Sequence, residues 1–121
     1  MQQAVPTFLE HAKTVMEQRE ADGVRGVDRE WSRFRCHVAT APFADRPITS
    51  IAPRDVREWL RIMAEKPAAV PGDPRTLSRH TVKRCQSLLS AVFADALERE
   101  IIEVNPALGV KLKKRVGEHS G

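Results

Sequence analysis

The stretch from Ser78 to Pro106 constrains the fold most, because it carries an uninterrupted apolar stripe at helical spacing. The stripe consists of Val82, Cys85, Leu89, Val92 and Ala96, with Leu88 and Phe93 beside it. Apolar residues three and four positions apart share one side of an α-helix, so the pattern predicts an amphipathic helix packed on a core. Ser78 is a suitable N-cap, because its hydroxyl can accept a hydrogen bond from a first-turn amide.

The opposite side of the first half of this helix is basic. It carries Arg79, His80, Lys83, Arg84, Ser87 and Ser90, and no acidic residue interrupts it before Asp95. Lys and Arg side chains neutralise phosphates, and an α-helix fits the major groove of duplex DNA. The candidate DNA contacts on this face are therefore Arg79, His80, Lys83, Arg84 and Ser87. The alternative is a solvated face without a partner.

Two shorter helices are expected before this one. Thr7 and Glu10 form a capping-box pair that starts the first helix, which should end before Gly23. Asp28 can cap the second helix, which ends at Ala41-Pro42 because the residue before a proline disfavours helical geometry. The apolar residues expected to share one side of the second helix are Val27, Trp31, Phe34 and Val38.

The polar sides of these two helices differ. The first mixes Glu17, Arg19, Glu20 and Asp22, which predicts a solvated face with no ligand preference. The second carries Arg29 and Arg33 one turn apart, with Arg25 in the preceding turn. If the second helix and the long helix line one concave surface, these three arginines would add to its DNA contacts.

A third helix is expected to begin at Pro53, which suits the first turn because a missing N–H costs nothing there. It carries Val56, Trp59, Leu60 and Met63 at helical spacing, and its polar side alternates acids with arginines, as salt-bridged solvated surfaces do. The segment from Pro67 to Leu77 contains three prolines and a glycine, which predicts a long surface loop between the third and fourth helices. The expected core includes Phe8, Trp31, Trp59, Leu60, Leu89, Val92 and Phe93, with Phe43, Ile48 and Ile51 of the preceding connector.

Composition supports a single soluble domain. The chain has 121 residues, 41% of them hydrophobic and 30% charged. Lys and Arg outnumber Asp and Glu by 20 to 16, and the net charge of +4 is a mild bias toward anionic partners. We assign residues 1–110 to the domain and 111–121 to a basic tail that includes Lys111, Lys113 and Lys114. No signal peptide or membrane-length apolar run is visible, so we expect a cytoplasmic protein without a membrane partner.

Short motifs along the chain resemble the core-binding domain of tyrosine recombinases, the phage-type integrases. In the last helix and its exit, they are Ser78, Thr81, Val82, Phe93, Ala96, Ile102 and Asn105-Pro106-Ala107. Upstream, they are Pro42-Phe43, Pro47-Ile48, Ile51, Asp55-Val56 and Trp59-Leu60. The chain departs from the family at Glu100, where a helix-ending glycine is usual, and at Ala52, where a hydroxyl cap is usual.

The resemblance implies an all-α, compact, SAM-like domain of four helices that binds duplex DNA as the N-terminal clamp of a recombinase. It also implies that other recombinase protomers assemble on the same DNA. The basic tail then corresponds to the linker that leads to a catalytic domain, while a solubilising tail explains the same residues equally well. Strand cleavage through a phosphotyrosine intermediate would belong to that absent domain.

The sequence offers little for catalysis or cofactors. It contains no tyrosine, which is the family's nucleophile, so we expect the chain itself not to be an enzyme. Its four histidines are scattered and no Cys or His pair has zinc-site spacing, so neither a metal, another cofactor nor a small-molecule substrate is expected. Cys85 lies on the apolar stripe as a core residue, whereas Cys36 is expected to be a surface thiol.

A second hypothesis is a helical protein-interaction module whose charged faces have no DNA role. It predicts that substitutions on an apolar surface groove abolish partner binding and that changes to the basic face do nothing. A regulatory helix-turn-helix protein fits poorly, because the loop before the last helix exceeds the turn of about 3–4 residues typical of that motif.

Overall fold

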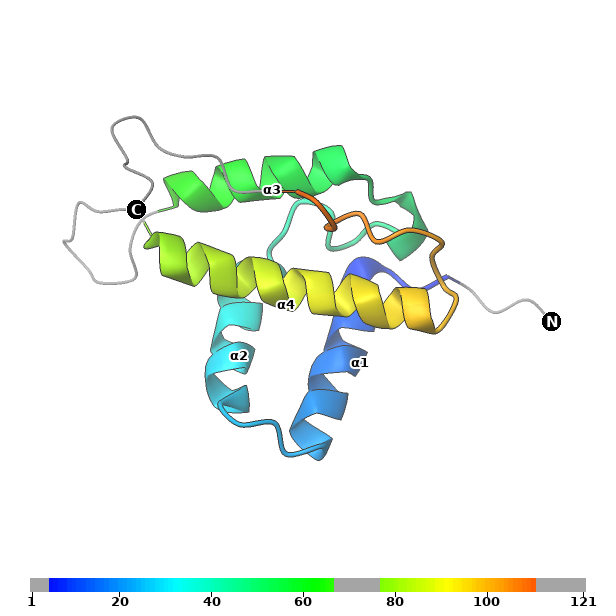
Figure 1. Ribbon diagram of the computed structural model, residues 1–121, viewed down its shortest axis with the longest axis horizontal. Coiled ribbons are helices and arrows are strands. Elements are labelled where there is room, and N and C mark those ends of the chain that lie inside the picture. The colour runs from blue at the N-terminus through cyan, green and yellow to red at the C-terminus, as the bar shows by residue number, and fades with distance from the viewer. Residues whose placement is uncertain (1–4, 67–76, 111–121) are drawn as a thin grey trace.

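The computed structural model describes residues 5–66 and 77–110, and within these ranges the protein is all-helical. Its four α-helices are α1 (Phe8–Ala21), α2 (Val27–Arg33), α3 (Pro53–Glu65) and α4 (Arg79–Glu98) (Figure 1). A π-helical turn, η1 (Phe34–Val38), continues α2, and a 3-10 turn, η2 (Ile48–Ser50), precedes α3. The expected all-α fold with four helices is confirmed.

Helix α4 is the central element of the fold. Figure 1 shows α3 running antiparallel along one side of α4, while α1 and α2 lie on its other side. Contacts link α4 to α1, α3 and η1. The seven buried residues of α4 are Val82, Cys85, Leu88, Leu89, Val92, Phe93 and Ala96, which confirms the apolar stripe. The stripe therefore faces the other elements, and the basic side of α4 is left at the surface.

The core is centred on aromatic side chains contributed by several elements. Phe8 packs edge-on against Phe43 with ring centroids 5.0 Å apart, and it also contacts Phe93 at 5.3 Å. Trp59 is buried, and its indole N–H donates a hydrogen bond to the carbonyl oxygen of His37, 3.2 Å away. The expected core residues that the structure buries are Phe8, Phe43, Ile48, Ile51, Trp59, Leu60, Leu89, Val92 and Phe93.

Trp31 differs from this expectation, because it is only partly buried and packs edge-on against Phe34 at 5.5 Å. Directly after this pair comes η1, where the N–H of Ala39 bonds to the carbonyl of Phe34, five residues earlier, at 2.7 Å. A π turn holds one more residue than an α turn, so side chains before and after it no longer share a side. Val27 and Trp31 are partly exposed, whereas Phe34 and Val38 are buried.

The helix starts follow local capping chemistry, with one exception to the expectation. Thr7 and Glu10 form the expected capping box, with reciprocal bonds of 2.9 and 3.1 Å. Asp28 does not cap α2. Gly26 takes the N-cap position with a φ of 77°, which a glycine adopts without steric cost, and its carbonyl accepts hydrogen bonds from the second helix's first turn. Asp28 lies inside that turn instead.

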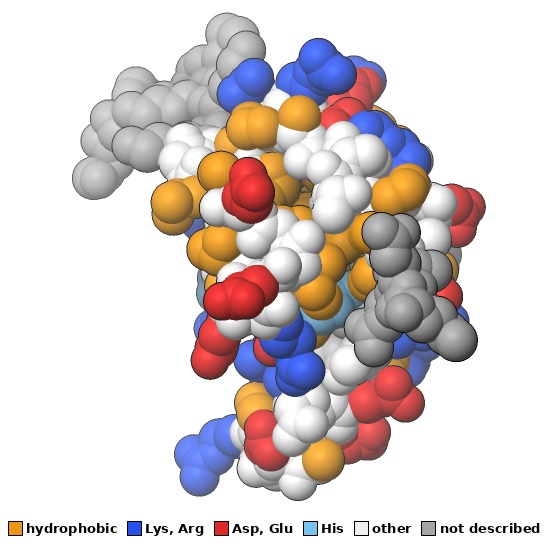
Figure 2. Space-filling model, turned by 90° about the vertical axis from the view of Figure 1, so that its right-hand side faces the viewer, with side chains coloured by type: hydrophobic (Ala, Val, Ile, Leu, Met, Phe, Trp, Pro, Cys, Tyr) orange, Lys and Arg blue, Asp and Glu red, His pale blue; other side chains and the backbone are white. Residues whose placement is uncertain are grey.

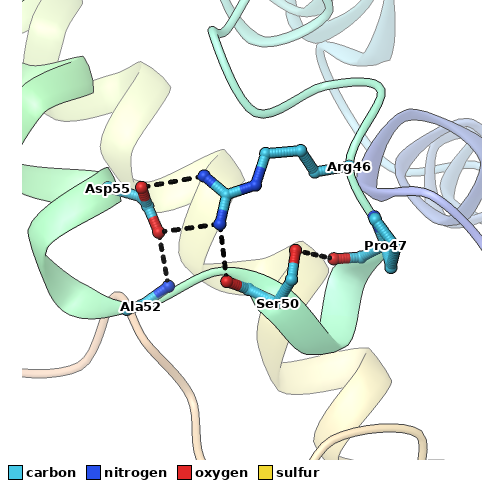
Figure 3. A network of polar contacts seen from close by, with 5 residues as sticks. All are labelled: Arg46, Pro47, Ser50, Ala52 and Asp55. Carbon is cyan, nitrogen blue, oxygen red and sulfur yellow. Dashed lines mark hydrogen bonds and ion pairs between the residues drawn. The ribbon is translucent and has the colours of Figure 1, made fainter.

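A polar network ties the connector before α3 to the start of that helix (Figure 3). The Arg46 guanidinium lies 2.9 Å from Asp55 Oδ1 and donates to the carbonyl oxygen of Ser50 at 2.7 Å. The Asp55 carboxylate also accepts a hydrogen bond from the N–H of Ala52 at 2.8 Å. This bond holds the pKa of Asp55 below its usual range, and the bond from Arg46 adds a smaller lowering of that pKa. Ala52 is the N-cap, but its side chain has no oxygen to accept the reciprocal hydrogen bond, so α3 has only half of a capping box.

The C-terminal end of α4 is closed by a Schellman motif around Glu100. The N–H of Ile101 donates to the carbonyl oxygen of Ala96 at 2.9 Å, and the N–H of Glu100 donates to the carbonyl oxygen of Leu97 at 3.0 Å. Glu100 has a φ of 61°, a left-handed conformation that glycine usually occupies. The departure from the resembled family therefore lies at a position where the backbone is strained.

The described ends of the loop between α3 and α4 meet. Helix α3 ends at Glu65, and the N–H of Leu77 donates to the carbonyl of Lys66 at 2.8 Å. After α4 the chain turns back on the domain, where Val110 is buried and its carbonyl accepts a hydrogen bond from Gln86 Nε2 at 2.6 Å. In the part of the chain that the structure describes, no helix combines the length and apolarity needed to cross a bilayer.

Candidate nucleic-acid interface

A hollow of about 420 Å³ lies between the α1–α2 turn, α2 and α4. Its lining consists of Arg19, Val24, Arg25, Gly26, Arg29, Glu30, Arg33, Arg84, Ser87, Leu88 and Ala91. The rim is mainly arginine, whereas Leu88 and Ala91 of α4 give it an apolar part. Figure 1 shows α1 and α2, which the turn in this lining connects, on the same side of α4.

Five candidate DNA contacts from two separate helix faces meet in this lining. They are Arg25, Arg29, Arg33, Arg84 and Ser87. The expectation that α2 and α4 line one concave surface is therefore met in the geometry. This arrangement concentrates positive charge, because the lining holds five arginines and one glutamate, a formal charge of +4.

The remaining candidates lie outside the hollow. His80 and Lys83 are exposed on α4, and Arg84 Nε donates to His80 Nε2 at 3.3 Å. Arg79 is half-buried at the first position of α4. The three tail candidates, Lys111, Lys113 and Lys114, lie outside the described residues. The basic face of α4 thus extends the hollow toward the N-terminal end of that helix.

Most arginines of the hollow are not neutralised by the protein. Among the described residues, no carboxylate pairs with Arg25, Arg29 or Arg33. Glu30 is bound by Arg19 in a bidentate pair, with Arg19 Nε 3.0 Å from Oε1 and Nη2 2.8 Å from Oε2. Three guanidinium groups therefore retain their hydrogen-bond donors for an anion, and paired donors of this kind match phosphate oxygens.

The Arg19–Glu30 pair was not predicted, since the sequence pattern assigned Arg19 to a solvated face. The two residues are eleven positions apart and on different helices. No short-range spacing rule connects them, because their contact depends on the angle between α1 and α2. The mixture of acids and bases on α1 gave no signal that its arginine would reach the basic side of α2.

A second polar cluster holds η1 against the end of α3. Lys66 Nζ lies 2.8 Å from both the carbonyl oxygen of Cys36 and the Nδ1 of His37. Burial, and then the Lys66 charge, lower the pKa of His37, which favours a neutral ring that can accept the lysine's hydrogen bond. This cluster lies next to the carboxyl end of α2 and holds the junction between α2 and the core.

The two cysteines occupy the predicted environments. Cys36 is exposed and Cys85 is buried, and both are free thiols. Burial raises the pKa of Cys85 to about 11, which keeps it a protonated, unreactive core residue. Within residues 5–66 and 77–110, no group of three or more His, Cys, Asp or Glu side chains is placed to hold a metal ion.

Comparison with known proteins identifies a structural relative. The fold is similar to the solution NMR structure of a fragment of a protein from Clostridium leptum, with a TM-score of 0.71 and 24% sequence identity over 95% of each chain. At this identity the similarity establishes the fold alone. No family model matches the sequence, and no curated protein matches it.

Proposed function

We propose that this chain binds duplex DNA through the hollow between α2 and α4, as the DNA-clamping domain of a protein of the tyrosine recombinase type. The observation that carries the proposal is the meeting of Arg25, Arg29, Arg33 and Arg84 around one cavity with a single, internally paired carboxylate. Such a surface attracts a polyanion, because each phosphate contact releases condensed counterions from the DNA. The motif resemblance supplies the second support.

In this proposal the two helices have different tasks. The exposed side of α4, with His80, Lys83 and Ser87, is long and regular enough to enter a major groove. The arginines of α2 bind the phosphates that flank the groove. Phosphate contacts fix the register of the protein, and base contacts by the α4 side chains provide whatever sequence preference exists. Strand cleavage and joining belong to a separate catalytic domain.

The test is fluorescence anisotropy of a labelled random-sequence duplex, titrated with protein at several salt concentrations. The variant Arg29→Ala/Arg84→Ala removes one exposed arginine of the hollow from each helix. We expect weaker binding and a salt slope reduced by about two units, since each lost phosphate contact removes about 0.9. The control is Arg54→Ala/Arg57→Ala, which removes two exposed arginines of α3 and should leave the slope unchanged. Equal slopes for both double variants, or no binding by the wild type at low salt, would contradict the proposal.

The protein-interaction hypothesis rests on a different surface. At the C-terminal end of α4 and in the segment after it, Leu97, Val104 and Leu108 are 40%, 71% and 77% exposed. Figure 2 faces this end of the molecule and shows hydrophobic side chains among acidic ones. A protein partner would contact these residues, so Val104→Ser/Leu108→Ser would disrupt its binding and leave DNA binding intact.

A further inference from the structure

Helix α2 carries Arg29 and Arg33 of the proposed site, with Arg25 in the turn before it, yet the core does little to hold this helix. The helix has seven residues, and none of them is buried. Its contacts are mainly with η1, which continues it, and with α1. In Figure 1 it lies beside α1 on one side of α4, joined to α1 by the turn before Gly26. Polar interactions therefore contribute a larger share of what holds α2 in position than they do for a helix packed in the core.

Arg19 of α1 makes two of these interactions. Its carbonyl accepts the N–H of Val24 at 3.1 Å, which shapes the turn into α2. Its guanidinium forms the bidentate pair with Glu30, in which the side chains of Arg19 and Glu30 are 31% and 22% exposed. Among the described residues, this is the ion pair that joins α1 to α2. A half-buried fork of this kind is more restrictive than an exposed single contact.

Glu30 is also the carboxylate in the lining of the hollow, on the same helix as Arg29 and Arg33. Without Arg19, its charge would compete with phosphate for those arginines and would repel the phosphate directly. We infer that Arg19 is a positioning residue for the DNA site: it holds the Glu30 carboxylate against α1 and so keeps the α2 arginines free for phosphate. The inference rests on the proposed DNA-binding function and adds to it a residue that sets the charge of the site.

The experiment compares Arg19→Ala, Glu30→Ala and the double variant Arg19→Ala/Glu30→Ala in the same anisotropy assay. We expect Arg19→Ala to weaken binding about tenfold, because an unpaired carboxylate then faces the phosphates at short range. Glu30→Ala should bind as tightly as the wild type or tighter. The double variant should return to within about threefold of the wild type, because the carboxylate that harms binding is also gone.

The matched control is Arg61→Ala, which removes another arginine that forms a bidentate ion pair with a glutamate. Arg61 Nε and Nη2 lie 3.0 and 2.7 Å from the Glu58 carboxylate on the exposed side of α3, away from the hollow. Its loss changes the net charge as Arg19→Ala does, yet we expect less than a twofold change in affinity. Thermal unfolding of each variant, followed by circular dichroism, should show that all remain folded.

The outcomes separate the inference from the function on which it rests. No DNA binding by the wild type would sink the proposed function, and the role of Arg19 with it. Wild-type binding with an unaffected Arg19→Ala would overturn only the role of Arg19. If Arg61→Ala bound DNA as weakly as Arg19→Ala, the effect of Arg19→Ala would be one of net charge alone. If the double variant bound DNA as weakly as Arg19→Ala, the pair would merely hold α2 in place. Each of these two results would also overturn the inference.

Discussion

Helices α2 and α4 both supply arginines to the hollow, but the protein holds them in different ways. Helix α4 buries seven side chains in the core, whereas α2 buries none and depends on η1, a glycine cap and the Arg19–Glu30 pair. The basic face of α4 is therefore carried by the described helix that buries the most side chains. Because α2 buries none, we expect changes to its polar contacts to move its charges at a smaller cost in stability.

The largest effect should separate the two helices by stability. Leu89→Ala removes a fully buried side chain of α4 and should lower the free energy of unfolding by about 3 kcal/mol, as cavity-forming substitutions do. Val27→Ala in α2 removes a partly exposed side chain and should cost less than about 1 kcal/mol. Urea unfolding of both variants measures the difference. Similar losses would mean that α2 belongs to the core after all.

A smaller effect is expected at the end of α4. Glu100→Gly should raise the free energy of unfolding by about 1 kcal/mol, because glycine adopts the left-handed φ of 61° without steric cost. Glu100→Ala keeps the Cβ atom and should show no such gain, which separates backbone strain from the loss of charge. DNA binding should be unchanged in Glu100→Gly, since Glu100 does not line the hollow. A gain shared by both variants would assign the effect to charge.

The smallest effect concerns the junction between α2 and the core. Burial, and then the Lys66 charge, hold the pKa of His37 in the folded protein below the usual histidine value of 6.5, so the unfolded chain binds the proton more readily. The contribution of His37 to stability is therefore complete above pH 6.5 and is lost as the pH falls below it. His37→Asn, whose side-chain oxygen can still accept from Lys66, should flatten this part of the curve of unfolding free energy against pH. An identical slope in wild type and variant would remove His37 as its cause.

The sequence predicted most of the fold because most of its determinants are local. The stripe on α4, the Thr7–Glu10 capping box and the proline at the start of α3 are each read from a few neighbouring residues, and all three are present. The start of α2 was mispredicted, since Asp28 is a good cap by type but Gly26 alone suits the left-handed backbone of the turn. Trp31 was placed in the core because it shares a helix side with the buried Phe34, yet no residue of α2 is buried.

The candidate site divides in the same way. The arginines of α2 and α4 could be predicted as faces of amphipathic helices, and the structure brings Arg25, Arg29 and Arg33 together with Arg84. The Arg19–Glu30 pair could not be predicted, because these two residues meet through tertiary geometry, although Glu30 is the one carboxylate among the described residues of the lining. Charges along one helix follow from periodicity, whereas charges paired between helices require the angle at which those helices cross.

The π turn at Phe34–Val38 also bears on how such a domain could diverge. One residue fewer in this turn would restore regular α-helical winding and rotate α2, together with Phe34, by about 100° relative to Val38. A single-codon deletion could therefore turn a different side of α2 toward the hollow while Val38 keeps its place. The gain or loss of one residue here would be a short evolutionary route to a different set of α2 side chains around the hollow.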